Sequence, residues 1–259
     1  MSSGILELSL TQLSIAYIFI LFLLWIFRKR KIPREKQIFI ASLRMTLQLT
    51  AMGYVLMFVF ENPSWWLTGL MILIMMLFSI HNAIARVKGS ISPELRRIVA
   101  LSMFGGALST SAFFVIVVLQ AVPWFHPQYF IPVSGMIVGN CMTGVALGAN
   151  KLCSDMEEKR VMLENSLMLG ATPAQAAREI INDAFDSAIL PTMNNMLTMG
   201  IVNLPGMMTG QILAGVFPLT AIKYQIAVML AILGGTALTT ILFVLLGYKT
   251  FFTRDCRLK

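Results

Sequence analysis

The stretch LTQLSIAYIFILFLLWIFRKRK, residues 10–31, decides the fold class of this chain. Its first 18 residues carry no charged side chain, and a basic cluster begins directly afterwards at Arg28. An apolar run of this length is what a helix needs to cross the hydrocarbon core of a bilayer. The stretch therefore predicts a membrane-spanning helix over about 10–27.

The composition of the whole chain agrees with this interpretation. Of its 259 residues, 57% are hydrophobic and 12% are charged, and the mean hydropathy is +0.78. Soluble domains carry roughly 25% charged residues. These values exclude a disordered or collagen-like chain, and they argue against a nucleic-acid partner despite a net charge of +8. The three cysteines form no close-spaced pair, so neither a disulfide framework nor a zinc site is expected.

Further apolar runs predict six more spans in an all-α, polytopic helix bundle. Proline and glycine interrupt the run after 187, so a broken or re-entrant helix is an alternative there. We expect one transmembrane domain over 1–259, with spans at about 10–27, 38–60, 66–85, 98–120, 131–149, 187–204 and 224–247.

The basic residues give the orientation of these spans. Only Glu7 is charged before the first span, and the basic cluster follows it, which is the reverse of a cleavable signal peptide. The positive-inside rule therefore places the N-terminus outside and the cluster in the cytoplasm. Alternation then assigns 18 of the 20 Lys and Arg residues to the cytoplasmic side, Arg44 and Lys223 being the exceptions. We expect a multi-pass protein of the plasma membrane.

The segment 150–186 is the one large polar segment and carries seven of the 12 acidic residues. Residues 154–169 predict an amphipathic helix that Gly170 ends. Thr172 and Gln175 have the spacing of a capping box, with Pro173 at the first helical position, so a second helix is expected from 173. Two helices joined by this corner would form a protruding knob suited to a cytoplasmic partner. The alternative is a long helical loop with no partner.

Four stretches resemble a known family. They are IPVSGMIVGN (131–140), LMLGATPAQAAREIINDAFDSAILPT (167–192), LPGMMTGQILAG (204–215) and AIKYQIAVML (221–230). They resemble the FetB-type family of ABC transporter permeases, which includes a bacterial permease described as an iron exporter and plant aluminium-tolerance half-transporters. The resemblance implies a permease homodimer in the lipid bilayer with a separately encoded cytoplasmic ABC ATPase.

The same resemblance implies the division of labour between the chains. The chain would export metal ions, iron being the first candidate, although an ABC permease for a non-metal solute is an alternative. It would be no enzyme and have no catalytic residue or bound cofactor, since ATP and Mg²⁺ would bind the partner. The absence of a GxxxxGK[ST] loop from the sequence agrees with this. The expected ATPase-coupling residues are Glu164, Gly170, Ala171, Thr172 and Pro173.

Polar residues within the spans are the candidates for a transport pathway. Arg44 lies inside the second span, where a charge costs roughly 2.5–3.5 kcal/mol unless it is paired or snorkels. It borders the pathway, snorkels to the cytoplasmic headgroups, or pairs with Asp183 or Asp186. Asn140 is either a pathway residue or a hydrogen-bonding residue between helices.

A methionine-rich segment in and after the sixth span is a weaker candidate for a metal path. Thioether and amide groups could hold a soft or borderline metal ion, but methionine is also an ordinary filler of apolar interfaces. The residues concerned are Met193, Met196, Met199, Met207 and Met208, with the neighbouring Asn194 and Asn195.

An ATP-independent channel or secondary carrier is the main alternative function. Such a protein is expected to place ionisable pairs near the bilayer midplane. The strongest intramembrane charge, Arg44, lies near one end of its span, and the sequence therefore favours the ABC permease.

Overall fold

A computed structural model describes residues 9–87, 91–253 and 256–258 of the chain. Within these ranges the protein is α-helical and contains no strand, only two isolated bridges. The all-α prediction is thereby confirmed. Lys88, Arg254 and Lys259, which contribute to the predicted cytoplasmic charge, lie outside the described residues, as does the N-terminal segment 1–8.

The chain folds as two compact units, Met1–Pro63 with Leu213–Gly215, and Ser64–Ile212 with Val216–Lys259. The first contains α1 (Leu10–Ala16), α2 (Ile18–Arg30) and α3 (Glu35–Glu61). Helices α2 and α3 pack as a hairpin, and the hydroxyl groups of Tyr17 and Thr46 hydrogen-bond within it. Most apolar side chains of these helices are exposed, which suits contact with lipid.

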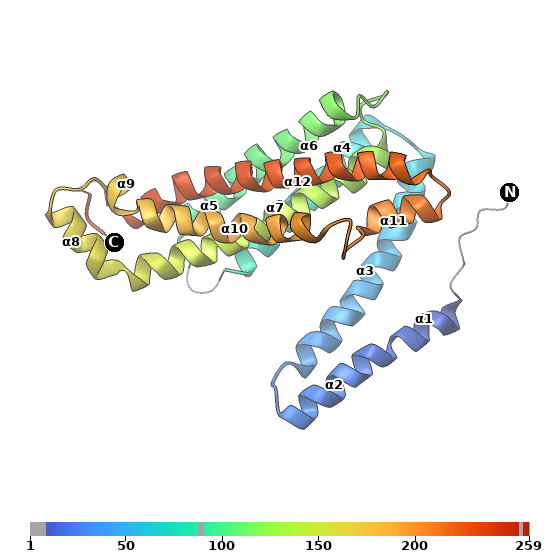
Figure 1. Cartoon of the computed structure of the whole chain (residues 1–259), viewed down its shortest axis with the longest axis horizontal. Coiled ribbons are helices and arrows are strands. Elements are labelled where there is room, and N and C mark those ends of the chain that lie inside the picture. The colour runs from blue at the N-terminus through green and yellow to red at the C-terminus, as the bar shows by residue number, and fades with distance from the viewer. Residues whose placement is uncertain (1–8, 88–90, 254–255, 259) are drawn as a thin grey trace. The chain divides into compact units, whose positions relative to one another are not determined.

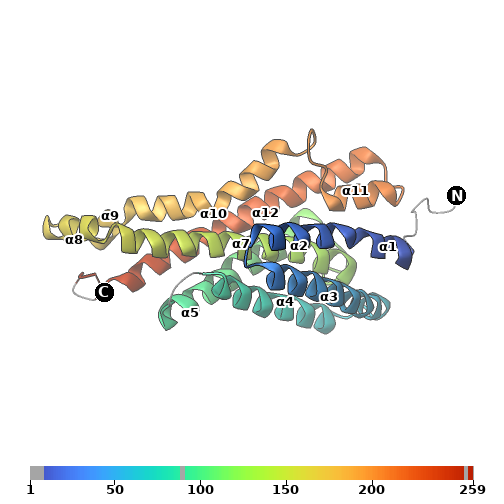
Figure 2. The ribbon, with the colours of Figure 1, turned by 90° about the horizontal axis from the view of Figure 1, so that it is seen from below.

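The second unit is a helix bundle built around one long central helix (Figures 1 and 2). This helix, α7, packs against α4, α10 and α12. In chain order the elements are α4 (Trp65–Ala85), α5 (Pro93–Ser102), the π-helical η1 (Met103–Leu108), α6 (Ser109–Phe113), the π-helical η2 (Phe114–Val118), α7 (Pro127–Glu158), α8 (Arg160–Met168), α9 (Pro173–Ala176), α10 (Arg178–Thr198), α11 (Gly206–Leu213), α12 (Pro218–Gly247) and the 3-10 helix η3 (Tyr248–Phe251).

Six helical segments among the described residues are long and apolar enough to cross a membrane, which agrees with six of the seven predicted spans. The predicted span at 187–204 has no such helix. There α10 begins early and carries Arg178, Glu179, Asp183 and Asp186, and it ends at Thr198. Its apolar part is therefore shorter than the roughly 17 residues that a span requires. The count of seven and the orientation stay predictions.

Two predicted helix boundaries around the polar segment were wrong. The first knob helix does not run unbroken over 154–169, because α7 continues from the fifth predicted span to Glu158 and the helix breaks at Lys159. The second knob helix does not run unbroken from 173, because α9 ends at Ala176 and α10 begins at Arg178. At both breaks one residue, Lys159 or Ala177, has a ψ near zero that interrupts the regular helix.

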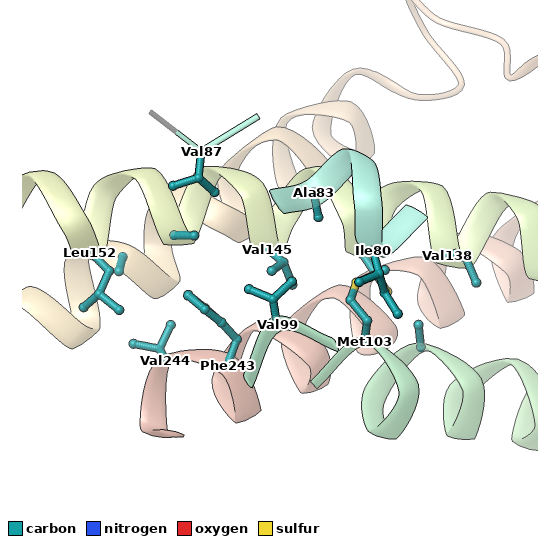
Figure 3. Packing of buried hydrophobic residues seen from close by; sticks show 14 of the residues in the cluster. Ile80, Ala83, Val87, Val99, Met103, Val138, Val145, Leu152, Phe243 and Val244 are labelled. Atoms are coloured by element: carbon teal, nitrogen blue, oxygen red, sulfur yellow. The ribbon is translucent and has the colours of Figure 1, made fainter. Parts of the chain in front are cut away.

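Small residues allow the core helices to approach closely. A Cβ atom on Gly106 of η1 would lie 2.6 Å from the Cα atom of Thr239 on α12. One on Gly144 of α7 would lie 2.6 Å from the methyl carbon of Thr236. Around these contacts Val99, Val145 and Phe243 pack as one apolar cluster (Figure 3). Glycine at these two positions therefore lets the backbones of η1 and α7 come close to α12, and larger side chains fill the space around the contacts.

Candidate coupling site

The predicted corner between the two knob helices is built as expected. Gly170 has a φ of +91°, in the left-handed region that glycine adopts at little cost. Its N–H donates to the Leu167 carbonyl at 3.0 Å, and the Ala171 N–H donates to the Ser166 carbonyl at 3.0 Å. This pair of bonds is a Schellman motif, which satisfies the last carbonyls of α8.

The next helix begins with the predicted capping box. The Thr172 hydroxyl accepts from the Gln175 N–H at 3.3 Å, and the Gln175 side-chain oxygen accepts from the Thr172 N–H at 2.9 Å. Pro173 occupies the first helical position, where its missing N–H costs nothing. The turn is thus fixed on both sides of Ala171, and the corner has one defined backbone conformation.

Ion pairs and buried side chains fasten the knob to the bundle. The Lys159 ammonium lies 2.8 Å from the Glu179 carboxylate and 3.4 Å from that of Asp183 on α10. The hydrogen bond to Glu179 raises the pKa of Lys159 above its ordinary value. Leu163 and Ala177 are fully buried beneath the corner. These contacts tie the start of α8 to α10.

The tip of the knob exposes apolar side chains. Met168 is 83% exposed and Leu169 is 89% exposed, and Val161 on α8 is 70% exposed. Beside them a cavity of about 410 Å³ separates the corner from the chain's last described residues, 256–258. Glu164 lines this cavity and also pairs with Arg160, its carboxylate 2.9 Å from the guanidinium Nε atom. The tip combines exposed apolar groups with a charged border, as protein interfaces do.

The polar pathway candidates are distributed over the two units. Arg44 is exposed on α3 in the first unit, whereas Asp183 and Asp186 lie on α10 in the second. The predicted pairing with Arg44 stays a prediction, and Asp183 has Lys159 as an ion-pair partner. Asn140 is half-buried, and its side-chain amide donates to the Met136 carbonyl at 2.8 Å, a bond within α7 itself.

The structure divides the methionine-rich segment into two groups. Met196, Met199 and Met208 line one groove, together with Gln225 and Met229 of α12, which sequence reasoning missed. The other residues of the segment, Met193, Met207, Asn194 and Asn195, do not line it. The described residues contain no group of three His, Cys, Asp or Glu side chains able to hold a metal ion.

The chain is similar to known proteins over most of its length. Residues 10–252 match the model of a family described as "Uncharacterised protein family (UPF0014)". The chain is 34% identical to "UPF0014 membrane protein YjkA" of Bacillus subtilis, with 96% of this chain and 97% of the relative covered. It is 35% identical to "Probable iron export permease protein FetB" of Escherichia coli, over 93% and 91% of the two chains. It is 34% identical to "Protein ALUMINUM SENSITIVE 3" of Arabidopsis thaliana, over 83% and 77%. No solved structure matches.

Proposed function

The chain belongs to the UPF0014 family of membrane proteins, and on this premise we propose that this multi-pass permease is the transport subunit of an ABC exporter. In this proposal two copies of the chain form the membrane part, and a separate ATPase chain binds each copy. The observation that carries it is the rigid corner at 169–173, whose apolar tip is exposed.

The corner has the properties required of a coupling element. Its backbone is fixed by the Schellman motif and the capping box. A force applied at Leu169 would therefore displace the corner as a rigid unit without changing its backbone conformation. The buried Leu163 and the ion pairs of Lys159 tie it to α7 and α10. Closure of an ATPase bound at the tip would thus reach the membrane helices through packed elements.

The chemistry of ATP hydrolysis belongs to the partner in this proposal. The sequence contains no GxxxxGK[ST] loop, so this chain lacks that device for holding phosphates. ATP and Mg²⁺ would bind in the ATPase chain. The residues of this chain position the partner and transmit its movement, and none of them needs to react.

Metal ions are the proposed cargo, with iron as the first candidate. The support is the printed name of the Escherichia coli relative, an iron export permease. The name of the Arabidopsis relative refers to aluminium sensitivity and leaves the cargo of that protein open. A non-metal solute is therefore the alternative cargo for this chain.

ATPase stimulation in a reconstituted complex tests this proposal. The chain and its ATPase are placed together in proteoliposomes, and hydrolysis is measured with Fe²⁺, Mn²⁺, Zn²⁺ and organic solutes in turn. We expect Fe²⁺ to raise the rate most, because a transported ligand favours the conformation that the ATPase closes upon. Stimulation by organic solutes alone would contradict a metal cargo. Transport without any ATPase chain would contradict the ABC assignment and support a channel or carrier.

A further inference from the structure

A methionine-lined groove lies between α10, the segment that follows it, and the first turns of α12. Its volume is about 360 Å³. Four of the residues that line it are methionines, namely Met196, Met199, Met208 and Met229. The segment between α10 and α12 therefore brings together thioether groups that are up to 33 positions apart in the sequence.

A single amide side chain also lines this groove. Gln225 is 5% exposed, and its side-chain oxygen is buried without a hydrogen-bond partner among the described residues. A buried polar atom left unpaired costs roughly 1–3 kcal/mol. Because Gln225 lines the groove, a rotation of its side chain would bring this closed-off oxygen to a ligand there, which would supply the missing interaction.

The backbone at the border of the groove is irregular. Helix α10 ends at Thr198 and α11 begins at Gly206. Between them Gly200 has a φ of +89°, and its N–H donates to the Asn203 carbonyl at 2.9 Å. Gly200, Leu204 and Pro205 of this irregular stretch line the groove, so the break in the helix shapes its border.

The groove lies far from the coupling corner. Gln225 is in the second turn of α12, whereas the tail that follows α12 borders the corner at 256–258. Gly247 lies 22 positions after Gln225, which corresponds to about 33 Å along the helix at 1.5 Å per residue. Figure 1 shows the two ends of α12 at opposite ends of the bundle formed by the second unit.

From these observations we propose that the groove is a binding site for a soft transition-metal cation, held by methionine sulfur atoms and the Gln225 carbonyl oxygen. Thioether sulfur binds soft ions such as Cu⁺ and Ag⁺ and has little affinity for hard ions such as Mg²⁺. Several neutral donors bind an ion reversibly, as a transport site requires. Metal binding in the groove does not depend on the proposed export function. Only the idea that the groove is a binding site on the transport pathway rests on that function.

Direct titration of the permease with Ag⁺ tests the site, with Mg²⁺ as the hard-ion control. The permease is studied in nanodiscs with Cys153→Ser and Cys256→Ser, because these two thiols are accessible and would compete for the ion, whereas Cys141 is buried. The test variants are Met199→Leu/Met208→Leu and Gln225→Leu. The matched control is Met193→Leu/Met207→Leu, which changes two neighbouring methionines that do not line the groove.

We expect Ag⁺ to bind the parent protein and Mg²⁺ not to bind. Loss of an outer-shell partner already weakens metal binding by about 10–100-fold, so removing two direct ligands should weaken Ag⁺ binding at least that much. The control should bind like the parent. Met→Leu replacements conserve volume and are tolerated in cores, and a thermal melt of each variant checks this. If Gln225→Leu does not fold, Ag⁺ binding by the Met199→Leu/Met208→Leu variant alone tests the proposal.

Three results would overturn the proposal: no Ag⁺ binding by the parent, equal binding by Met199→Leu/Met208→Leu, or an equal loss in the control. The same titration with Fe²⁺ shows whether the proposed cargo uses this groove. The proposed export function fails separately, because it is measured as ATPase stimulation. If the permease binds Ag⁺ in the groove but stimulates no ATPase, the proposed metal site stands and the proposed export function is wrong.

Discussion

Replacing both apolar residues at the tip of the knob, as Met168→Glu/Leu169→Glu, is expected to abolish copurification of the partner ATPase and leave the permease folded. Both side chains are more than 80% exposed, so the core loses no contact. In the complex the ATPase would bury both side chains, and the burial of each contributes about 1.5–3 kcal/mol to the free energy of binding. Losing both should weaken binding by about 100-fold or more, and burying unpaired carboxylates adds a further penalty.

The chain offers a matched control for this experiment. Ile201 and Val202 are a second consecutive pair of exposed apolar residues, 93% and 82% exposed, in the same unit. Ile201→Glu/Val202→Glu should therefore leave the ATPase bound. Pull-down from membranes, with size-exclusion chromatography of the permease alone, measures both variants. An ATPase that stays bound to the tip variant, or is lost equally from the control, would show that the corner is not its docking site.

Gly106→Ala is expected to cost about 3 kcal/mol or more of stability and to prevent the bundle from packing. The added Cβ atom would lie 2.6 Å from Thr239 Cα and 2.8 Å from Thr239 N. Backbone atoms of a packed helix cannot move aside as a flexible side chain can. Overpacking a core costs about 1–3 kcal/mol, and more when backbone must shift.

The neighbouring glycine supplies the control for Gly106. A Cβ atom on Gly105 would meet only the Leu242 methyl carbon, at 3.7 Å, an ordinary van der Waals distance. Gly105→Ala should therefore be neutral or slightly stabilising, since alanine favours helix by about 1 kcal/mol over glycine. Thermal unfolding in detergent compares the two variants. Equal melting temperatures would mean that η1 and α12 do not approach as closely as described.

Local signals made the fold class and the coupling corner predictable from the sequence. A span requires only a long apolar run, and the corner requires only Gly170 followed by Thr172, Pro173 and Gln175 at fixed spacing. Each of these signals acts within a few residues. They define the local geometry whatever the rest of the chain does, and the Schellman motif and capping box confirm it.

Features that depend on distant parts of the chain were not predictable in the same way. Gly106 and Thr239 are more than 130 positions apart, so nothing in the sequence near either residue indicates their contact. Gln225 lies in an otherwise apolar run, and its role at the groove emerges only when α10 and α12 are side by side. The predicted span at 187–204 was also affected, because the helix that enters this apolar run ends at Thr198, and no residue pattern near 198 marks that end.

The central claim, that the corner at 169–173 binds a separate ATPase, is tested most directly by crosslinking at its tip. A photo-crosslinking amino acid is placed at Leu169, or at Trp124, which is also exposed but lies in the loop between the fourth and fifth predicted spans, in cells that produce the ATPase. We expect light to join the ATPase to the chain from position 169 and not from position 124. A crosslink from position 124 alone, or an ATPase that copurifies without any crosslink from position 169, would contradict the claim.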